Sequence, residues 1–269
     1  MNGYEKSRIL MEIKARIAET MPLNPILNGW NSYSQCDEDG IIRECLTRIR
    51  NSGCEMSQTF LELGCGNGLE NNTAQLLIDN FTGCWVDGSR ENIKFIEENL
   101  GGGGIFPSLL VQESFLTLDN IEEIIKNCTN FLGTEETDFL SLDIDGNDLA
   151  LLPKILSYVT PKLLCVEYNA KFPPSTVVEM TYLESHAWSG DDYFGASLQA
   201  YVNCLNDYQL VCCNMSGCNA FFAHKNYAGV FAGYNVRDLY QPARYWLAAG
   251  AEGHPSSLKW IRQAVNKNR

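Results

Sequence analysis

The sequence is short of basic residues. It has 20 lysines and arginines against 33 aspartates and glutamates in 269 residues, which gives a formal net charge of −13. A chain this acidic repels the phosphates of nucleic acids and the headgroups of anionic lipids. We therefore expect neither nucleic acid nor an anionic membrane surface as a main partner.

Long apolar runs are missing as well. No segment approaches the roughly 20 apolar residues that a membrane-spanning helix needs. Residues 1–10 contain no apolar core of signal-peptide length. We therefore expect no membrane span and a cytoplasmic location.

Cysteine pairs typical of metal sites are also absent. The sequence has 11 cysteines but no CxxC pair, and the densest group is Cys212, Cys213 and Cys218. Others, such as Cys84 and Cys165, lie in apolar, strand-like segments. We expect buried free thiols in a reducing compartment rather than disulfides or a zinc site.

What the sequence does have is an alternation of strands and helices. Hydrophobic residues make up 45% of the chain, enough to bury the core of an α/β domain. Apolar residues at helical spacing predict helices over 5–21, 39–50, 74–78, 89–100, 121–126 and 196–205. Short apolar runs predict strands over 59–63, 83–87, 109–112, 139–143 and 163–167, and a closing hairpin of 208–213 and 219–223.

Continuous apolar strands separated by helices indicate a parallel sheet that is covered on both faces. We expect N-terminal helices over 1–55, one α/β domain over 56–235 and a helical tail over 236–269. Residues 168–195 follow the last parallel strand, are rich in aromatic residues and show no period. We expect them to form an ordered lid over a site.

The strongest signal for function is the glycine-rich turn at 62–68, ELGCGNG. Gly64, Gly66 and Gly68 follow a strand directly, so the backbone can approach a ligand closely. The spacing differs from the GxGxxG of dinucleotide folds, because the third glycine comes one residue early. Glu62 would also repel a pyrophosphate, whereas it could hold an ammonium group or an ordered water.

Polar residues follow the next two strands as well. Asp87 ends the second strand, where a carboxylate can accept both hydroxyls of an adenosine ribose. Gly88 and Ser89 come directly after it, and Glu113 and Ser114 follow the third strand, where they could face an adenine. The ligand implied has an adenosine and an amino-acid head but no phosphates, which describes S-adenosylmethionine.

The turn at 62–68 resembles motif I of class I methyltransferases. The segments that more narrowly resemble FkbM-like methyltransferases are 34–40 (SQCDEDG), 143–148 (DIDGND), 167–169 (EYN), 193–198 (YFGASL) and 217–222 (GCNAFF). One departure is Asp145, which stands where the FkbM pattern usually has Glu. We add Gln35, in the first segment, to the expected cofactor-binding residues.

This resemblance implies a Rossmann-like methyltransferase fold, an α/β fold with a mostly parallel seven-stranded sheet, an antiparallel closing strand and helices on both faces. It also implies methylation of a hydroxyl on a sugar or natural product. The acceptor would be a small molecule or a saccharide. Whether the chain forms a homo-oligomer is left open.

Carboxylates follow the fourth and fifth predicted strands, whose carboxyl ends meet at one edge of the sheet. Asp143, Glu167 and Asn169 could hold Mg²⁺ or Mn²⁺, and metal-dependent O-methyltransferases use a similar arrangement. The alternative without metal is that Asp143 orients the cosubstrate while Asp145 or His186 takes the proton. Both interpretations are kept.

Two other functions and one structural role also remain open. A nucleotide-dependent oxidoreductase is disfavoured by the early third glycine and by Glu62. A non-catalytic binding module would have no need of Glu62, Asp87 and Asp143 together. Asp148 could simply cap the helix that follows it.

Overall fold

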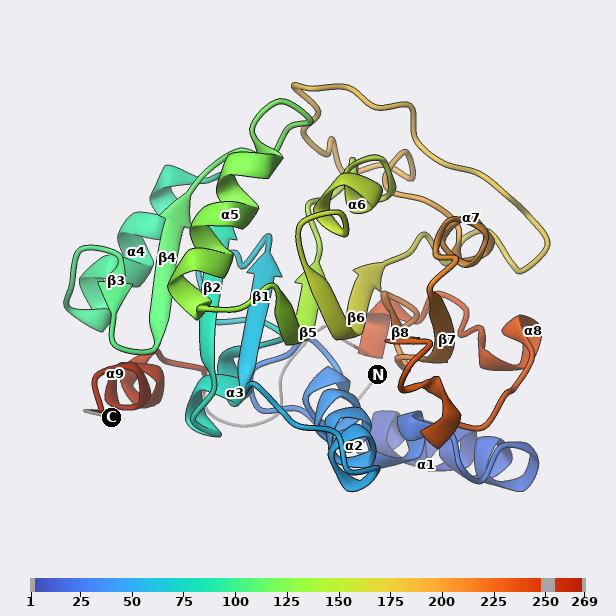
Figure 1. Cartoon of the computed structure of the whole chain (residues 1–269). Helices are drawn as coiled ribbons and strands as arrows, with labels where there is room; N and C mark the ends of the chain where they lie inside the picture. Colours follow the sequence, from blue (N-terminus) through green and yellow to red (C-terminus); the bar gives the residue numbers. More distant parts are fainter. Residues whose placement is uncertain (1–2, 248–254, 268–269) are drawn as a thin grey trace.

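An eight-stranded sheet forms the centre of the computed structural model, which describes residues 3–247 and 255–267 (Figure 1). The strand order is β3-β4-β2-β1-β5-β6-β8-β7; β8 is antiparallel to both its neighbours and β3 to β4, and the central pairs are parallel. The strands are β1 (Thr59–Leu63), β2 (Thr82–Asp87), β3 (Ile105–Phe106), β4 (Leu109–Glu113), β5 (Glu136–Leu142), β6 (Thr160–Glu167), β7 (Tyr208–Cys213) and β8 (Asn219–His224).

The strand order leaves a crevice at the carboxyl end of β1. From β1 the chain moves to β2 and β4 on one side, and then crosses to β5 and β6 on the other. Loops that leave such a switch point diverge, and ligands bind between them. The predicted Rossmann-like methyltransferase fold is confirmed. The sheet has eight strands rather than seven, because β3 adds an edge strand too short to show a period.

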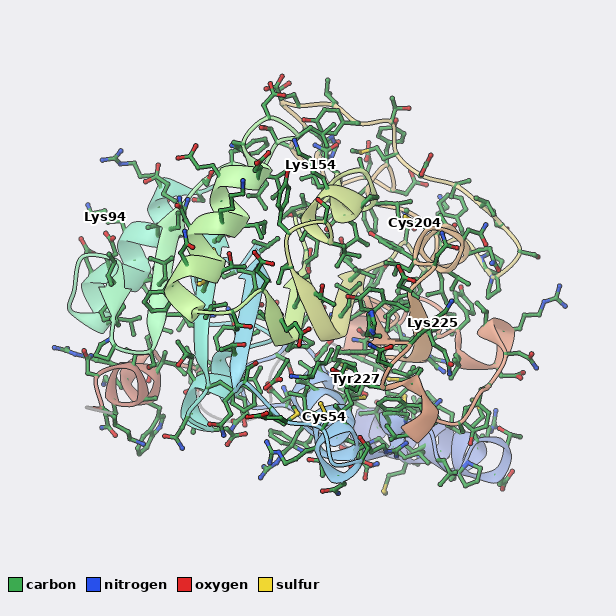
Figure 2. The ribbon with its side chains drawn as sticks, viewed as in Figure 1. Cys54, Lys94, Lys154, Cys204, Lys225 and Tyr227 are labelled. Carbon is green, nitrogen blue, oxygen red and sulfur yellow. The ribbon has the colours of Figure 1, made fainter. Side chains whose placement is uncertain are left out.

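Helices pack around this sheet, with α5 and α6 in front of it in Figure 1. A helix was expected after Asp148, but its bounds were not predicted, since α6 is short and contains Pro153, a residue that usually interrupts helices. Lys154 ties α6 to the loop before α5 by donating to the carbonyl of Leu118 at 2.6 Å (Figure 2). The helices are α1 (Gly3–Thr20), α2 (Glu38–Asn51), α3 (Ala74–Ile78), α4 (Arg90–Leu100), α5 (Ile121–Leu132), α6 (Asp148–Ile155), α7 (Leu198–Cys204), α8 (Val236–Leu239) and α9 (Lys259–Val265).

The core explains the apolar runs of the sequence. All five residues of β1 are buried, which is why this strand shows no polar alternation. The 11 cysteines are free, and among the described side chains Cys212, Cys213 and Cys218 form no metal-binding group. None of the described helices is long and apolar enough to cross a membrane.

The C-terminal tail returns to the parallel half of the sheet. Its last helix, α9, packs on α3 and α4, and Leu258 is buried beside the turn that carries Gly68. Residues 248–254, 268 and 269 of the predicted tail lie outside the described residues. The described part of the tail therefore packs against the glycine-rich turn next to Gly68.

Candidate functional site

A cleft of about 1650 Å³ opens at the carboxyl ends of the parallel strands. Sites for single small ligands are usually about 300–1,000 Å³, so this cleft has room for two molecules side by side. The predicted site residues that line it are Gln35, Glu62, Gly64, Gly66, Asp87, Gly88, Ser89, Asp143, Asp145, Glu167, Asn169 and His186.

The glycine-rich turn needs two of its glycines for different reasons. At Gly64 the φ angle is +89°, and a Cβ atom would lie 1.6 Å from the carbonyl oxygen of Asp143, so no other residue fits. At Gly66 the φ angle is +56°, and a Cβ atom would meet nothing within 4 Å. Because Gly66 lines the cleft, that open space is available to a ligand.

Asp87 is held in a fixed orientation beside this turn. Its Oδ2 accepts a hydrogen bond from the backbone N–H of Gly66 at 2.8 Å. Its Oδ1 accepts from the N–H of Ser89 at 2.8 Å and from the side chain of Asn92 at 3.1 Å. Asn92, in the first turn of α4, was not among the predicted site residues. The carboxylate is thus pre-oriented at the cleft wall.

Glu62 lies below the turn and is almost fully buried. Its carboxylate accepts from the backbone N–H of Asn72 at 3.0 Å and from the hydroxyl of Thr73. Desolvation by burial raises the pKa of Glu62 to about 7 against the lowering effect of these hydrogen bonds, of which the one from Thr73 is the largest. Glu62 therefore ties the start of α3 to the end of β1.

Three of the predicted residues do not line the cleft. Gly68 faces inward, and a Cβ atom there would lie 2.9 Å from the ring of Trp85. Glu113 is exposed, and the backbone of Ser114 donates to the carbonyl of Asp87 at 2.9 Å. The next residues, Phe115 and Leu116, line the cleft in their place. This part of the cleft is therefore apolar rather than polar.

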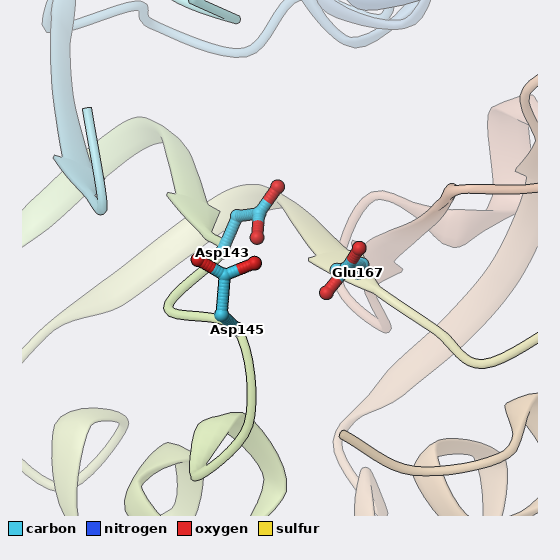
Figure 3. A group of neighbouring side chains, drawn as sticks. All are labelled: Asp143, Asp145 and Glu167. Atoms are coloured by element: carbon cyan, nitrogen blue, oxygen red, sulfur yellow. The ribbon is translucent and has the colours of Figure 1, made fainter. Parts of the chain in front are cut away.

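Three carboxylates meet at the ends of β5 and β6 (Figure 3). Asp143, Asp145 and Glu167 each offer an oxygen, and these oxygens all lie within 4.8 Å of one another. Desolvation, and next the charge of Asp148, raises the pKa of Asp143 well above its usual range. Desolvation and then Asp143 do the same for Glu167. Such a group is suited to binding positive charge.

Asn169, which was predicted to share a metal with Asp143 and Glu167, is occupied elsewhere. Its Oδ1 accepts from the backbone N–H of Lys171 at 3.2 Å. Its Nδ2 donates to the carbonyls of Asp192 at 3.0 Å and Phe194 at 3.2 Å. Asn169 thus joins the two ends of the segment 168–195, and Asp145 takes its place in the carboxylate group.

Asp145 stands at the tip of a strained turn, with a φ angle of +58°. The buried carboxylate of Asp148 accepts from the backbone N–H groups on both sides, Ile144 at 3.0 Å and Gly146 at 2.9 Å. Asp148 was considered as a cap for the following helix; it instead holds the turn that precedes it. The turn presents Asp145 to the cleft.

The segment 168–195 is fastened to this same turn. Asn147 and Leu183 exchange two hydrogen bonds, Nδ2 to carbonyl at 2.8 Å and backbone N–H to Oδ1 at 3.2 Å. His186 follows, with its Nε2 3.1 Å from the carbonyl oxygen of Asp145 and its ring against Gly146. His186 and Asp145, the two alternative proton acceptors, therefore lie next to each other, with the ring nitrogen of His186 on the backbone carbonyl of Asp145.

The cleft as a whole is strongly acidic. Its basic side chains among the described residues are His186 and Lys171, and Lys171 pairs with Asp192. The acidic residues that line it are Glu62, Glu70, Asp87, Asp143, Asp145, Glu167, Asp191 and Asp192. A cationic ligand is attracted to such a cleft, and a phosphate is repelled.

Comparison with known proteins gives only distant similarity. No family model and no curated protein matches the chain. An O-methyltransferase from Bacillus cereus in complex with SAH (S-adenosyl-L-homocysteine) is 13% identical, with a TM-score of 0.43 over 79% of this chain and 89% of that chain. A methyltransferase from Geobacter sulfurreducens is 12% identical, with a TM-score of 0.41 over 80% and 88%.

A third similar structure is an RNA methyltransferase from Salinibacter ruber in complex with S-adenosyl-L-homocysteine. It is 14% identical, with a TM-score of 0.30 over 50% of this chain and 82% of that chain. Because these identities and scores are low, the fold assignment rests on the strand order and register described above.

Proposed function

We propose that this protein is an S-adenosylmethionine-dependent methyltransferase. The observation that carries the proposal is the fixed carboxylate of Asp87 beside the open face of Gly66, in a cleft whose charged side chains are mostly acidic. S-adenosylmethionine carries a sulfonium and an ammonium group and no phosphate. The pyrophosphate of a nicotinamide cofactor would be repelled by these carboxylates. The oxidoreductase alternative is therefore disfavoured.

The proposed cosubstrate position follows from the lining of the cleft. The ribose hydroxyls would donate to Asp87, and the adenine would lie against Phe115 and Leu116. The methionine part would pass the backbone of Gly64 and Gly66 toward the three carboxylates. Its methyl group would then point into the part of the cleft under the segment 168–195, which we propose is the acceptor lid.

We propose a hydroxyl group of a sugar or natural product as the methyl acceptor. The oxygen attacks the methyl carbon in line with the sulfur, so that an O–C bond forms while the C–S bond breaks and the sulfonium becomes a thioether. The hydroxyl proton passes to His186, whose Nε2 lies 3.1 Å from the carbonyl oxygen of Asp145, or, in the alternative without metal, to the carboxylate of Asp145. The protein aligns the partners and excludes water.

A divalent cation, Mg²⁺ or Mn²⁺, is proposed as a second cofactor. The carboxylates of Asp143, Asp145 and Glu167 suit it, since hard divalent ions take oxygen ligands and the three oxygens converge. When bound, such an ion acts as a Lewis acid and lowers the pKa of a hydroxyl. Asp143 would hold this ion in addition to facing the cosubstrate.

The Asp87→Ala variant tests the cosubstrate site. Removing the carboxylate deletes charged hydrogen bonds worth about 1.5–3 kcal/mol each, so the affinity for S-adenosylhomocysteine should fall at least about tenfold. Isothermal titration calorimetry measures this directly. The matched control is Glu98→Ala, an exposed carboxylate on α4 outside the cleft, which should bind normally. Equal affinity in Asp87→Ala and the wild type would refute the assignment.

The Trp188→Ala variant tests the lid. Trp188 lines the cleft, is 50% exposed, and has its ring nitrogen fixed by the carbonyl of Asp191 at 2.7 Å. Loss of an aromatic contact worth about 0.5–1.5 kcal/mol should raise the acceptor KM roughly three- to tenfold. The affinity for S-adenosylhomocysteine should stay within about twofold of the wild type.

These kinetics need an acceptor, which is found by incubating the protein with S-adenosylmethionine and a panel of polyhydroxylated compounds. Mass spectrometry then shows any product heavier by one methylene. The control is Trp260→Ala, an exposed tryptophan on α9 that does not line the cleft. A lower affinity of Trp188→Ala for the cosubstrate, with an unchanged acceptor KM, would contradict the assignment of the lid.

A further inference from the structure

Asn219, at the start of β8, carries a buried oxygen without a hydrogen-bond partner in the described structure. The residue is only 4% exposed, yet its Oδ1 accepts no hydrogen bond. Its Nδ2 donates to Oε1 of Glu38 at 3.2 Å, which fixes the orientation of the amide. Burying a hydrogen-bond acceptor without a donor costs free energy, so a ligand bound at this oxygen would stabilise the structure.

Glu38 is itself locked in place, so the orientation of Asn219 is built into the fold. The other oxygen of Glu38 accepts from the backbone N–H of Cys36 at 2.7 Å, and its Oε1 also accepts from Asn214. Asn214 in turn accepts from the backbone N–H of Asn219 at 3.0 Å. Exchanging the positions of Oδ1 and Nδ2 of Asn219 would place two oxygen acceptors, Oδ1 of Asn219 and Oε1 of Glu38, against each other.

The unpartnered oxygen lies beside the carboxylate group of the cleft. Asn219 is the direct antiparallel partner of Glu167 in the pairing of β6 with β8. Side chains of directly opposite residues share one face of a sheet, with Cβ atoms about 4.5–5.5 Å apart. Both residues line the cleft, and Oε2 of Glu167 is a second buried oxygen without a hydrogen-bond partner in the described part of the chain.

Among the described residues, none donates a hydrogen bond to Oδ1 of Asn219 or to Oε2 of Glu167. Lys171, the lysine that lines the cleft, is paired with Asp192 on the exposed rim. Asn169 has both its oxygen and its nitrogen in hydrogen bonds within the lid. The three converging carboxylates and the neutral amide oxygen of the residue opposite Glu167 therefore line the same cleft, whose lysine is paired elsewhere.

We propose that Oδ1 of Asn219 is the neutral ligand of a divalent-cation site formed with Asp143, Asp145 and Glu167. Mg²⁺ and Mn²⁺ prefer such hard oxygen ligands and keep waters in their remaining positions. The inference rests on the proposed function for the role of the cation in methyl transfer, but metal binding itself is measurable without cosubstrate. Glu38 is a positioning residue, because it aims the amide oxygen.

The test is a titration of the full chain with Mn²⁺. Binding is measured by calorimetry and by the loss of the electron spin resonance signal of free Mn²⁺. The wild type should bind Mn²⁺ at one site. Asn219→Leu should weaken that binding roughly 10- to 100-fold, the usual cost of disturbing a metal site. Asn219→Ala is a milder second variant with the same expected direction. Asn203→Leu, on the exposed side of α7, is the matched control.

Binding of S-adenosylhomocysteine without metal is measured on the same samples. The affinity for S-adenosylhomocysteine should be unchanged in Asn219→Leu and Asn219→Ala, and this result would show that both variants are folded. The same measurement tests the proposed function independently of the cation site. Wild-type affinity for Mn²⁺ in both variants would overturn the role of Asn219. Absence of Mn²⁺ binding in the wild type would overturn the whole cation site, even if the wild type binds S-adenosylhomocysteine.

Discussion

The Gly66→Val variant is expected to lose all measurable binding of S-adenosylhomocysteine. The open space in front of Gly66 faces the cleft, and its backbone N–H is bonded to Asp87. A valine side chain would fill the volume through which the ligand must pass to reach that carboxylate. Calorimetry over a concentration range that saturates the wild type measures the loss.

The control for this variant is Gly133→Val. Gly133 ends α5 with a φ angle of +71°, and a Cβ atom there would also meet nothing within 4 Å. Both substitutions place a branched residue in the left-handed region, at a similar cost in strain, but Gly133 does not line the cleft. Gly133→Val should therefore bind normally. Normal binding by Gly66→Val would mean that the turn is not the cosubstrate site.

Glu167→Gln should lower turnover about 100-fold or more. The substitution keeps the shape of the side chain but removes a charge from the group that we propose binds the cation. Losing about 3 kcal/mol of transition-state stabilisation corresponds to roughly that factor. Excess chelator should reduce wild-type turnover in the same way, and Mg²⁺ or Mn²⁺ should restore it.

Two further measurements separate this effect from a loss of folding. The affinity of Glu167→Gln for S-adenosylhomocysteine should stay close to that of the wild type. Glu184→Gln, an exposed lid carboxylate that does not line the cleft, should retain full turnover. Undiminished turnover in chelator, with no metal found by elemental analysis, would contradict the cation proposal.

The sequence was sufficient for the features that depend on local pattern. The strand β1 and the turn after it could be predicted. A fully buried strand appears in the sequence as a continuous apolar run, and a turn with positive φ angles appears as glycines. The same holds for Asp87, whose place at the end of β2 follows from the strand prediction. These features define the half of the cleft in which we propose that the cosubstrate binds.

The half that we propose binds the acceptor could not be predicted in the same way, because it is built from contacts between distant segments. Asn147 and Leu183 are separated by 36 residues, and Glu38 and Asn219 by 181. Neither pair leaves a periodic signal. Gly68 resembles Gly64 and Gly66 in sequence, yet it faces the ring of Trp85, which only the three-dimensional packing reveals.

The most direct test of the central claim is a calorimetric titration of the wild-type protein with S-adenosylmethionine and, in parallel, with NAD. The fixed carboxylate of Asp87 in an acidic cleft predicts one molecule of S-adenosylmethionine bound per chain and no detectable binding of NAD. Binding of NAD in preference to S-adenosylmethionine, or binding of neither, would contradict the account.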